Sequence, residues 1–165
     1  MKKAFLLTGS NLGNREENLS RAIRFLSLET GYIVNFSNIY ESSPWGFDAK
    51  QKFLNQAIEL NTNLLPIELL NNIFKIEHII GRRRNGNAGY SSREIDIDII
   101  FYNDEIINEE LLTIPHPLIT QRRFALVPLT EICPFLIHPQ LKKTLSQLLS
   151  ECKDNATIHL YKNSA

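Results

Sequence analysis

Two aspartates, Asp96 and Asp98, stand two positions apart in the β-branched run of residues 93–102. Residues i and i+2 of a β-strand point to the same face, so both carboxylates leave one side of the strand, roughly 7 Å apart. Paired negative charge at that spacing is unfavourable unless a metal ion or an arginine neutralises it. Hard cations such as Mg²⁺ bind carboxylates that also face phosphate groups, so the pair predicts a magnesium and phosphate site. A merely solvated strand face is the alternative.

Arginines flank this pair along the chain. Arg82, Arg84 and Arg93 precede it, the first two in the glycine-containing segment 81–90, and Arg122 follows it. Guanidinium groups match phosphate oxygens bidentately, and a glycine-rich loop can fold over a ligand. We therefore expect residues 81–90 to form a closing lid, with a solvated charged loop as the alternative.

One histidine, His116, lies between Pro115 and Pro117, which fix the backbone on either side of it. This rigid presentation favours a contact with a ligand phosphate, although a histidine in a surface turn is the common outcome. A zinc site is not expected, because the chain offers no set of three or four nitrogen or sulfur ligands at a known spacing.

Aromatic and amide side chains form a second group. Phe53 and Asn55 share one side of a predicted strand, and Trp45 and Phe47 lie in the loop before it. Stacking faces and amide hydrogen bonds suit a flat heteroaromatic ligand, while core packing explains each residue separately. The turn at residues 9–13 lacks the Walker A and dinucleotide motifs, so we interpret it as a structural strand-to-helix turn.

The elements that must position these side chains follow from hydrophobic periodicity and turn residues. Their order is β-α-β-β-α-β, which predicts an α+β, ferredoxin-like core: an antiparallel sheet with helices, followed by C-terminal additions. The core ranges are strands 3–8, 32–42, 53–61 and 94–102 and helices 15–29 and 66–80. The additions are a short strand near 105–107, helical pieces near 121–131 and 143–151, and a strand at 157–161.

Composition and charge are those of an ordinary globular protein. The chain has 165 residues, 43% hydrophobic and 22% charged, and 18 basic residues balance 18 acidic ones. We expect one domain over residues 1–165, without a fused second enzyme. Nucleic-acid and membrane partners favour a basic excess, so neither is expected. The apolar run at residues 4–7 is too short for a signal peptide. Two cysteines do not make a disulfide framework in a domain of this size, so we expect a cytoplasmic protein.

Several short motifs, in their order and spacing, resemble those of the 6-hydroxymethyl-7,8-dihydropterin pyrophosphokinase family of folate biosynthesis. The match spans about residues 3 to 135, and Arg93-x-x-Asp96-x-Asp98 followed by Pro115-His116-Pro117 is its most specific part. The resemblance implies the ferredoxin-like fold, ATP, two Mg²⁺ ions and a pterin substrate. The other motifs are Gly9-Ser10-Asn11-Leu12-Gly13, Ser43-Pro44-x-Gly46, Phe53-Leu54-Asn55, Glu77, Gly81-Arg82-x-Arg84 and Arg122-x-Phe124.

The resemblance also implies roles for individual residues. Asp96 and Asp98 would hold both magnesium ions, and Arg82 and Arg93 would stabilise charge during catalysis. ATP would contact Glu77, Arg84, His116 and Arg122, whereas the pterin would contact Ser43, Pro44, Trp45, Phe53, Asn55 and Phe124. The departures from the family pattern are Phe74 in place of a frequent Gln, Phe53 in place of a frequent Tyr, and Ala88-Gly89-Tyr90 in place of a basic residue and Trp.

The implied reaction is pyrophosphoryl transfer from ATP to the pterin hydroxymethyl group with release of AMP, by a monomer acting on small molecules. A metal-dependent phosphohydrolase and a non-catalytic nucleotide-binding module on the same fold are the alternatives, because fold does not fix function. An RNA-binding sheet is disfavoured, because carboxylates stand on the strand where stacking aromatics would be expected.

Overall fold

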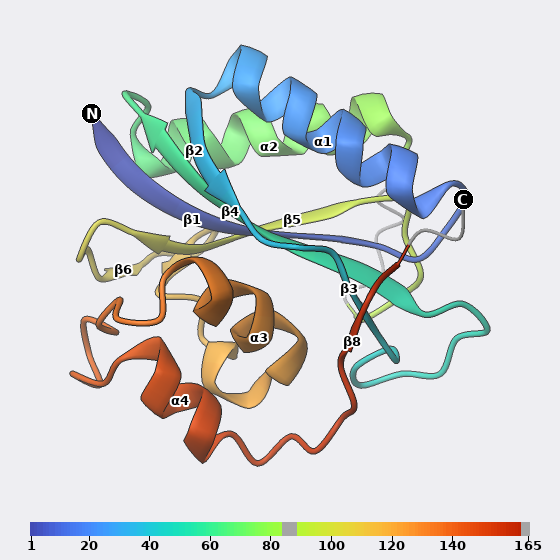
Figure 1. The fold of residues 1–165 in the computed structure, drawn as a ribbon. Helices are drawn as coiled ribbons and strands as arrows, with labels where there is room; N and C mark the ends of the chain where they lie inside the picture. Colours follow the sequence, from blue (N-terminus) through green and yellow to red (C-terminus); the bar gives the residue numbers. More distant parts are fainter. Residues whose placement is uncertain (84–88, 163–165) are drawn as a thin grey trace.

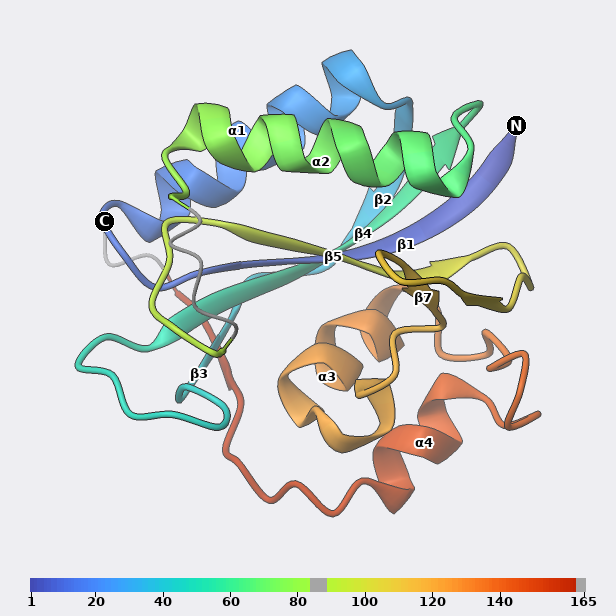
Figure 2. The same cartoon turned by 180° about the vertical axis from the view of Figure 1, so that it is seen from behind.

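The computed structural model describes residues 1–83 and 89–162 (Figure 1). A central antiparallel sheet carries α1 (Arg15–Glu29) and α2 (Pro66–Ile80) on one face and α3 (Arg123–Ile132) and α4 (Leu145–Glu151) on the other (Figures 1 and 2). The strands run in the order β5-β1-β4-β3-β8, and β2 also pairs with β4. Their bounds are β1 (Lys2–Ser10), β2 (Tyr32–Phe36), β3 (Tyr40–Ser42), β4 (Phe53–Thr62), β5 (Asp96–Tyr102) and β8 (His159–Leu160). The predicted β-α-β-β-α-β core with C-terminal additions is confirmed.

Local signals account for the ends of the two core helices. The Asn14 side chain caps α1 by accepting a hydrogen bond from the Glu17 amide at 3.2 Å. Pro66 occupies the first turn of α2, where its missing N–H costs nothing. Gly81 ends α2 at φ 125°, a left-handed conformation that favours glycine, and its amide donates to the carbonyls of Glu77 and His78. These three helix ends therefore follow from the sequence.

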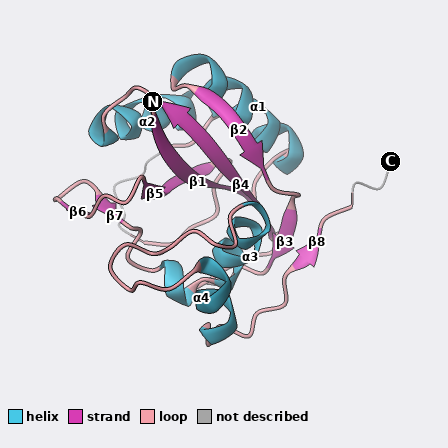
Figure 3. Ribbon diagram, turned by 60° about the vertical axis from the view of Figure 1, so that its left-hand side comes forward, coloured by secondary structure: helices cyan, strands magenta, loops and turns pink. Residues whose placement is uncertain are grey.

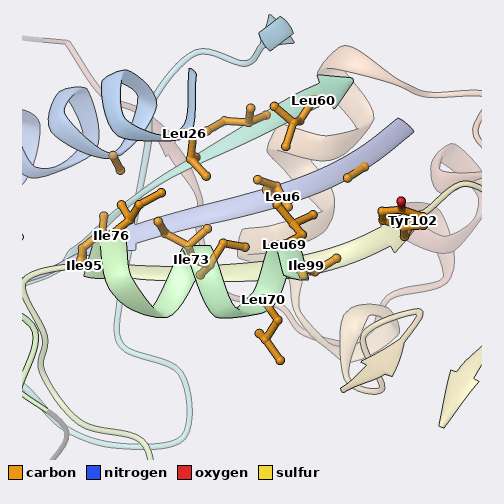
Figure 4. Close-up of a cluster of buried hydrophobic side chains, with 14 of the residues drawn as sticks. Leu6, Leu26, Leu60, Leu69, Leu70, Ile73, Ile76, Ile95, Ile99 and Tyr102 are labelled. Atoms are coloured by element: carbon orange, nitrogen blue, oxygen red, sulfur yellow. The ribbon is translucent and has the colours of Figure 1, made fainter. Parts of the chain in front are cut away.

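Two hydrophobic clusters fix the sheet between its helices. The first joins β1, β4 and β5 to α1 and α2, and its fully buried members include Leu6, Leu60 and Ile73 (Figure 4). The second lies on the opposite face, where Leu7 packs with Leu126 and other residues of α3 and α4. Burial on both faces makes the central strands a rigid base for side chains at their ends.

Strand β5 shows how this base orients the candidate metal ligands. Ile97 and Ile99 belong to the cluster beneath α1 and α2. Side chains alternate along a strand, so Asp96 and Asp98 point to the other face, the one that carries α3. The strand begins at Asp96 rather than at 94, so the first carboxylate stands at its entrance.

Three predicted elements differ from the structure in extent or pairing. The strand expected over 32–42 is divided into β2 and β3, because the Ser37 side chain and backbone bond to Ala57 and draw the chain away from regular pairing. The strand expected near 105–107 is β6 (Ile107–Asn108), which pairs with the unpredicted β7 (Thr113–Ile114) in a separate two-stranded sheet (Figure 3). The last strand, expected at 157–161, is β8, paired with β3.

Candidate active site

A cleft of about 560 Å³ opens on the face of the sheet that holds the two aspartates. This volume is within the range of roughly 300 to 1,000 Å³ that is typical of small-molecule sites. Its walls come from β1, β4, β5, the end of α2, the 43–52 loop, residues 110–117 and the start of α3. The sequence-predicted residues among its lining are Ser43, Trp45, Phe53, Asn55, Glu77, Arg82, Arg93, Asp96, Asp98, His116, Arg122 and Phe124.

Two predicted site residues are not among that lining. Pro44 lies half-buried in the 43–52 loop between two lining residues. Arg84 lies outside the described residues, as does the part of the expected lid from 84 to 88. The structure therefore places both described ends of the 81–90 segment, at Arg82 and at Tyr90, against the cleft.

Two arginines converge on one aspartate at the floor of the cleft. Nη1 of Arg82 donates to Oδ1 of Asp96 at 2.6 Å, and Nη1 of Arg93 lies 3.1 Å from the same oxygen. The Asp96 side chain is 27% exposed, so a ligand can still reach it. The two guanidinium groups bring N–H donors to the floor of the cleft, in a geometry that suits phosphate oxygens.

Glu77 is buried beneath this cluster and orients Arg82. Its Oε1 accepts hydrogen bonds from the Ile97 amide at 2.8 Å and from Nη1 of Arg82 at 2.5 Å. Burial opposes the charge of Arg82, but Asp96 and Glu77 outweigh that effect and raise the pKa of its guanidinium. Glu77 thus holds Arg82 from behind, and the contact with ATP expected for it stays a prediction.

The negative charge of Asp98 is unfavourable at its place in the cleft. Burial and the nearby Asp96 raise its pKa to about 7, although Arg122, 3.7 Å from its Oδ2, opposes the shift. A divalent cation would offset this unfavourable negative charge, because its positive charge is shared between the two carboxylates. The two oxygen donors therefore fit Mg²⁺.

The remaining ligands of such a cation would have to come from elsewhere. In residues 1–83 and 89–162, no cluster of three or more His, Cys, Asp or Glu could hold a metal ion. Mg²⁺ usually keeps several waters and takes one or two carboxylates together with substrate phosphates. The site thus fits a metal that arrives with a phosphorylated ligand.

His116 and Arg122 form a pair of donors beside the carboxylates. Burial and the neighbouring Arg122 lower the pKa of His116 to about 4, so the ring is neutral near pH 7. Its Nδ1 accepts a hydrogen bond from the Leu118 amide at 3.1 Å, which assigns the ring proton to Nε2. Nε2 lies 3.5 Å from Nη1 of Arg122, and an anionic oxygen would satisfy both donors.

The aromatic end of the cleft begins beside Arg122. The Arg122 guanidinium lies 5.0 Å from the Trp45 ring centroid and 5.7 Å from that of Phe124. Phe47 meets Phe53 edge to face at 6.1 Å, and the buried Asn55 donates to the Ser42 hydroxyl at 2.8 Å. Ring faces beside an amide group match a flat heteroaromatic ligand.

Two residues at the site have contacts that sequence reasoning did not identify. Asn11 is fully buried, and its Oδ1 accepts a hydrogen bond from the Arg93 backbone amide at 2.7 Å. The Asn11 backbone amide donates in turn to the Arg93 carbonyl. The Tyr90 hydroxyl accepts a hydrogen bond from Arg122 at 2.9 Å, and its ring meets Trp45 edge to face. Both contacts join segments far apart in the chain, and turn chemistry alone explains an asparagine in the 9–13 turn.

The chain is similar to a known protein family, to curated relatives and to solved structures. The model of the 7,8-dihydro-6-hydroxymethylpterin-pyrophosphokinase family matches residues 5–134. A 2-amino-4-hydroxy-6-hydroxymethyldihydropteridine pyrophosphokinase of Aquifex aeolicus is 42% identical over 151 residues, which cover 92% of each chain. A relative of the same name from Bacillus subtilis is 41% identical over 79% of this chain and 77% of its own.

Solved structures share the fold. The chain resembles Plasmodium falciparum HPPK-DHPS in complex with pterin and p-hydroxybenzoate, with a TM-score of 0.73 and 19% identity. The similarity covers 91% of this chain and 41% of that one, so this chain spans about two fifths of the solved protein.

Proposed function

The chain belongs to the 7,8-dihydro-6-hydroxymethylpterin-pyrophosphokinase family, and from this premise we propose how its cleft performs the reaction. The enzyme transfers the pyrophosphoryl group of ATP to the hydroxymethyl group of 6-hydroxymethyl-7,8-dihydropterin, a step of folate biosynthesis. A bond forms between the hydroxymethyl oxygen and the β-phosphorus, the bond from that phosphorus to the bridging α,β-oxygen breaks, and AMP leaves. The hydroxyl proton is released.

The pterin is assigned to the aromatic end of the cleft. Its flat ring stacks between aromatic side chains, and the Asn55 amide, turned toward the cleft beside Ser42, reads its polar edge. The hydroxymethyl group then points along the cleft toward the aspartates. The residues assigned to the pterin are Ser43, Pro44, Trp45, Phe53, Asn55 and Phe124.

The triphosphate of ATP is assigned to the cationic part of the cleft. His116 and Arg122 offer their donors to phosphate oxygens, Glu77 keeps Arg82 in place, and Arg84 is assigned to the same ligand on the family pattern alone. Arg82 and Arg93 already meet at Asp96, so they stand where charge develops on the transferred group. Preorganised donors of this kind supply the largest part of catalysis in phosphoryl transfer.

Asp96 and Asp98 are the proposed ligands of two Mg²⁺ ions. When bound, magnesium supplies charge neutralisation and a template for the phosphate oxygens. With a metal at Asp96, Arg93 and Arg82 would be able to turn donors toward the phosphates, with Arg82 still bonded to Glu77. The convergence of two arginines on Asp96, beside an Asp98 whose pKa is raised by burial and by Asp96, is the observation that carries the proposal.

The cellular setting is proposed from the sequence. Residues 1–165 are assigned to one pyrophosphokinase domain, since both hydrophobic clusters share a single sheet. No helix in the part of the chain that the structure describes is long and apolar enough to cross a bilayer. We assign the enzyme to the cytoplasm, as a monomer.

Product analysis tests the proposal. The protein is incubated with ATP and Mg²⁺, with or without 6-hydroxymethyl-7,8-dihydropterin, and nucleotides are separated by chromatography. AMP that appears only when the pterin is present, in equal amount to pterin diphosphate, is the expected result. Phosphate or pyrophosphate release without pterin would indicate a phosphohydrolase, and ATP binding without AMP would indicate a non-catalytic module.

A further inference from the structure

The loop that joins β3 to β4, residues 43–52, carries Trp45 and Phe47 into the aromatic end of the cleft. We propose that a clasp at the base of this loop, formed by Arg15, Glu41, Tyr161 and the Lys52 carbonyl, positions the loop and thereby sets the affinity for the pterin. The inference rests on the proposed function, which places the pterin at this end of the cleft.

Arg15 joins the two ends of the loop through one nitrogen. Its Nη1 donates to Oε2 of Glu41 at 2.8 Å and to the Lys52 carbonyl, also at 2.8 Å. Glu41 stands two residues before the loop begins, and Lys52 is its last residue. The side chains of Arg15 and Glu41 are 17% and 24% exposed, so this pair is shielded better than an ordinary surface salt bridge.

Tyr161 brings the C-terminal segment to the same place. Its hydroxyl donates to Oε1 of Glu16 at 2.6 Å, and its ring centroid lies 5.8 Å from the guanidinium carbon of Arg15. The Tyr161 amide donates to the Ile39 carbonyl at 2.8 Å, directly after the pairing of β8 with β3. The end of the described chain thus supports both the arginine and the strand that leads into the loop.

The position of β3 explains why such support matters (Figure 1). β3 has three residues and borders β4 on one side and β8 on the other. With both ends of the loop held, movement is confined to its middle, where Trp45 and Phe47 line the cleft. Ordering these side chains before binding lowers the entropy that binding must overcome. The clasp residues are positioning residues, since they act through the loop rather than on the substrate.

The motion of the loop can be measured without any ligand. Trp45 is the single tryptophan of the chain, so its fluorescence anisotropy decay reports on the loop alone. Arg15→Ala and Tyr161→Ala should add a fast component on the nanosecond timescale of loop motion. Arg24→Ala, another arginine of α1, and Tyr32→Ala, an exposed tyrosine of β2, serve as matched controls and should decay like the wild type.

Steady-state kinetics then test the effect on the substrate. Each clasp variant should raise KM for the pterin about tenfold while KM for ATP changes by less than about twofold, because only the pterin end loses preorganisation. Tyr161→Phe keeps the ring over Arg15 and should show a smaller rise than Tyr161→Ala. The double variant of Arg15 and Tyr161 should be less impaired than the sum of both changes, as expected for residues in contact.

Two results would overturn the inference. One is Trp45 motion and a pterin KM in the clasp variants equal to those of the controls. The other is an equal rise of both KM values, which indicates general structural damage. Failure of the proposed function looks different, because the wild type itself would form no pterin-dependent AMP, while the anisotropy decay still decides whether the clasp holds the loop.

Discussion

Arg93 is held at the site from both its backbone and its side chain. Asn11 bonds to its amide and carbonyl, the Arg93 Nε donates to the Ser91 carbonyl, and Nη1 lies 3.1 Å from Asp96. A guanidinium fixed in this way needs little reorganisation when charge develops on a phosphoryl group. Its contribution should therefore appear in the chemical step.

Replacement of Arg93 tests this role. Arg93→Ala should lower kcat by about 10²-fold, comparable to the loss of one preorganised donor. Arg93→Lys keeps the positive charge but lacks the paired N–H donors of the guanidinium, so its kcat should lie between those of Arg93→Ala and the wild type. Single-turnover AMP formation at saturating ATP and pterin measures the effect. A change confined to KM for ATP would assign Arg93 to binding alone.

The pKa of Asp98 predicts how magnesium binding depends on pH. The folded-state pKa is about 7, above the ordinary value for an aspartate, so between about pH 4 and pH 7 the folded protein holds a proton that the unfolded chain has lost. The contribution of Asp98 to stability without metal therefore falls as pH rises through this window. Because Mg²⁺ competes with this proton, magnesium affinity should rise up to about pH 7 and then level off.

Calorimetry can follow the proton directly. Titration of the enzyme and a nonhydrolysable ATP analogue with Mg²⁺, in buffers of different ionisation enthalpy, should show release of close to one proton at pH 6 and almost none at pH 8. Equal proton release at both values would contradict the assignment of Asp98 as a ligand.

Residue types and spacing could predict which side chains share the cleft, because alternation on one strand is a local property. Asp96 and Asp98 lie on one face for this reason, and Arg93 is three residues from the first of them. The contacts of Asn11 and Tyr90 could not be predicted, because their partners, Arg93 and Arg122, are 82 and 32 residues away in the chain. Such contacts exist only in the folded chain.

At the scale of elements, α2 connects the hydrophobic core to the site. Its Ile73 is fully buried between the helix and the sheet. Glu77, one turn later, accepts hydrogen bonds from Arg82 and from the Ile97 amide at the start of β5. Packing of the helix therefore also sets the position of Arg82, which we propose to act in catalysis. Damage to this packing should reduce both stability and activity.

A matched pair of isoleucines on α2 tests this connection. Ile73→Ala should lower the free energy of unfolding by about 2 to 5 kcal/mol, through lost burial and a cavity. Ile79→Ala, at a 53% exposed position of the same helix, should change it by no more than about 0.5 kcal/mol. Urea unfolding followed by circular dichroism gives both values. Equal losses in the two variants would contradict the assigned packing of α2.

Helices were easier to predict than short strands. The bounds of α1 and α2 match their predicted ranges because caps and apolar periodicity lie within the segments themselves. The division of 32–42 depends on Ser37 bonding to Ala57, and β7 exists only by pairing with β6. Two-residue strands such as these carry no periodicity that a sequence could reveal.

At the scale of the whole molecule, the sheet brings segments between Leu7 and Phe124 to one cleft. β1, β4 and β5 form its floor, α2 supplies Glu77, and the connection before α3 supplies Arg122. The match of the family model over residues 5–134 covers these parts. β8, beyond that range, reaches the site only through β3 and the clasp.

The carboxylates of β5 are the proposed ligands of the metal that binds the ATP phosphates for transfer. Asp98→Asn removes the negative charge and keeps the shape, and it should fold normally because the raised pKa of Asp98 marks its charge as unfavourable in the metal-free protein. Asp104→Asn, at an exposed turn after the same strand, is the control.

The decisive measurement is magnesium-dependent AMP formation by these two variants with ATP and 6-hydroxymethyl-7,8-dihydropterin, each compared with the wild type. We predict that Asp98→Asn loses at least about 10²-fold in turnover, as preorganised electrostatic stabilisation is removed, while Asp104→Asn keeps wild-type turnover. Near-wild-type turnover of a folded Asp98→Asn enzyme, with the same magnesium dependence, would contradict the account.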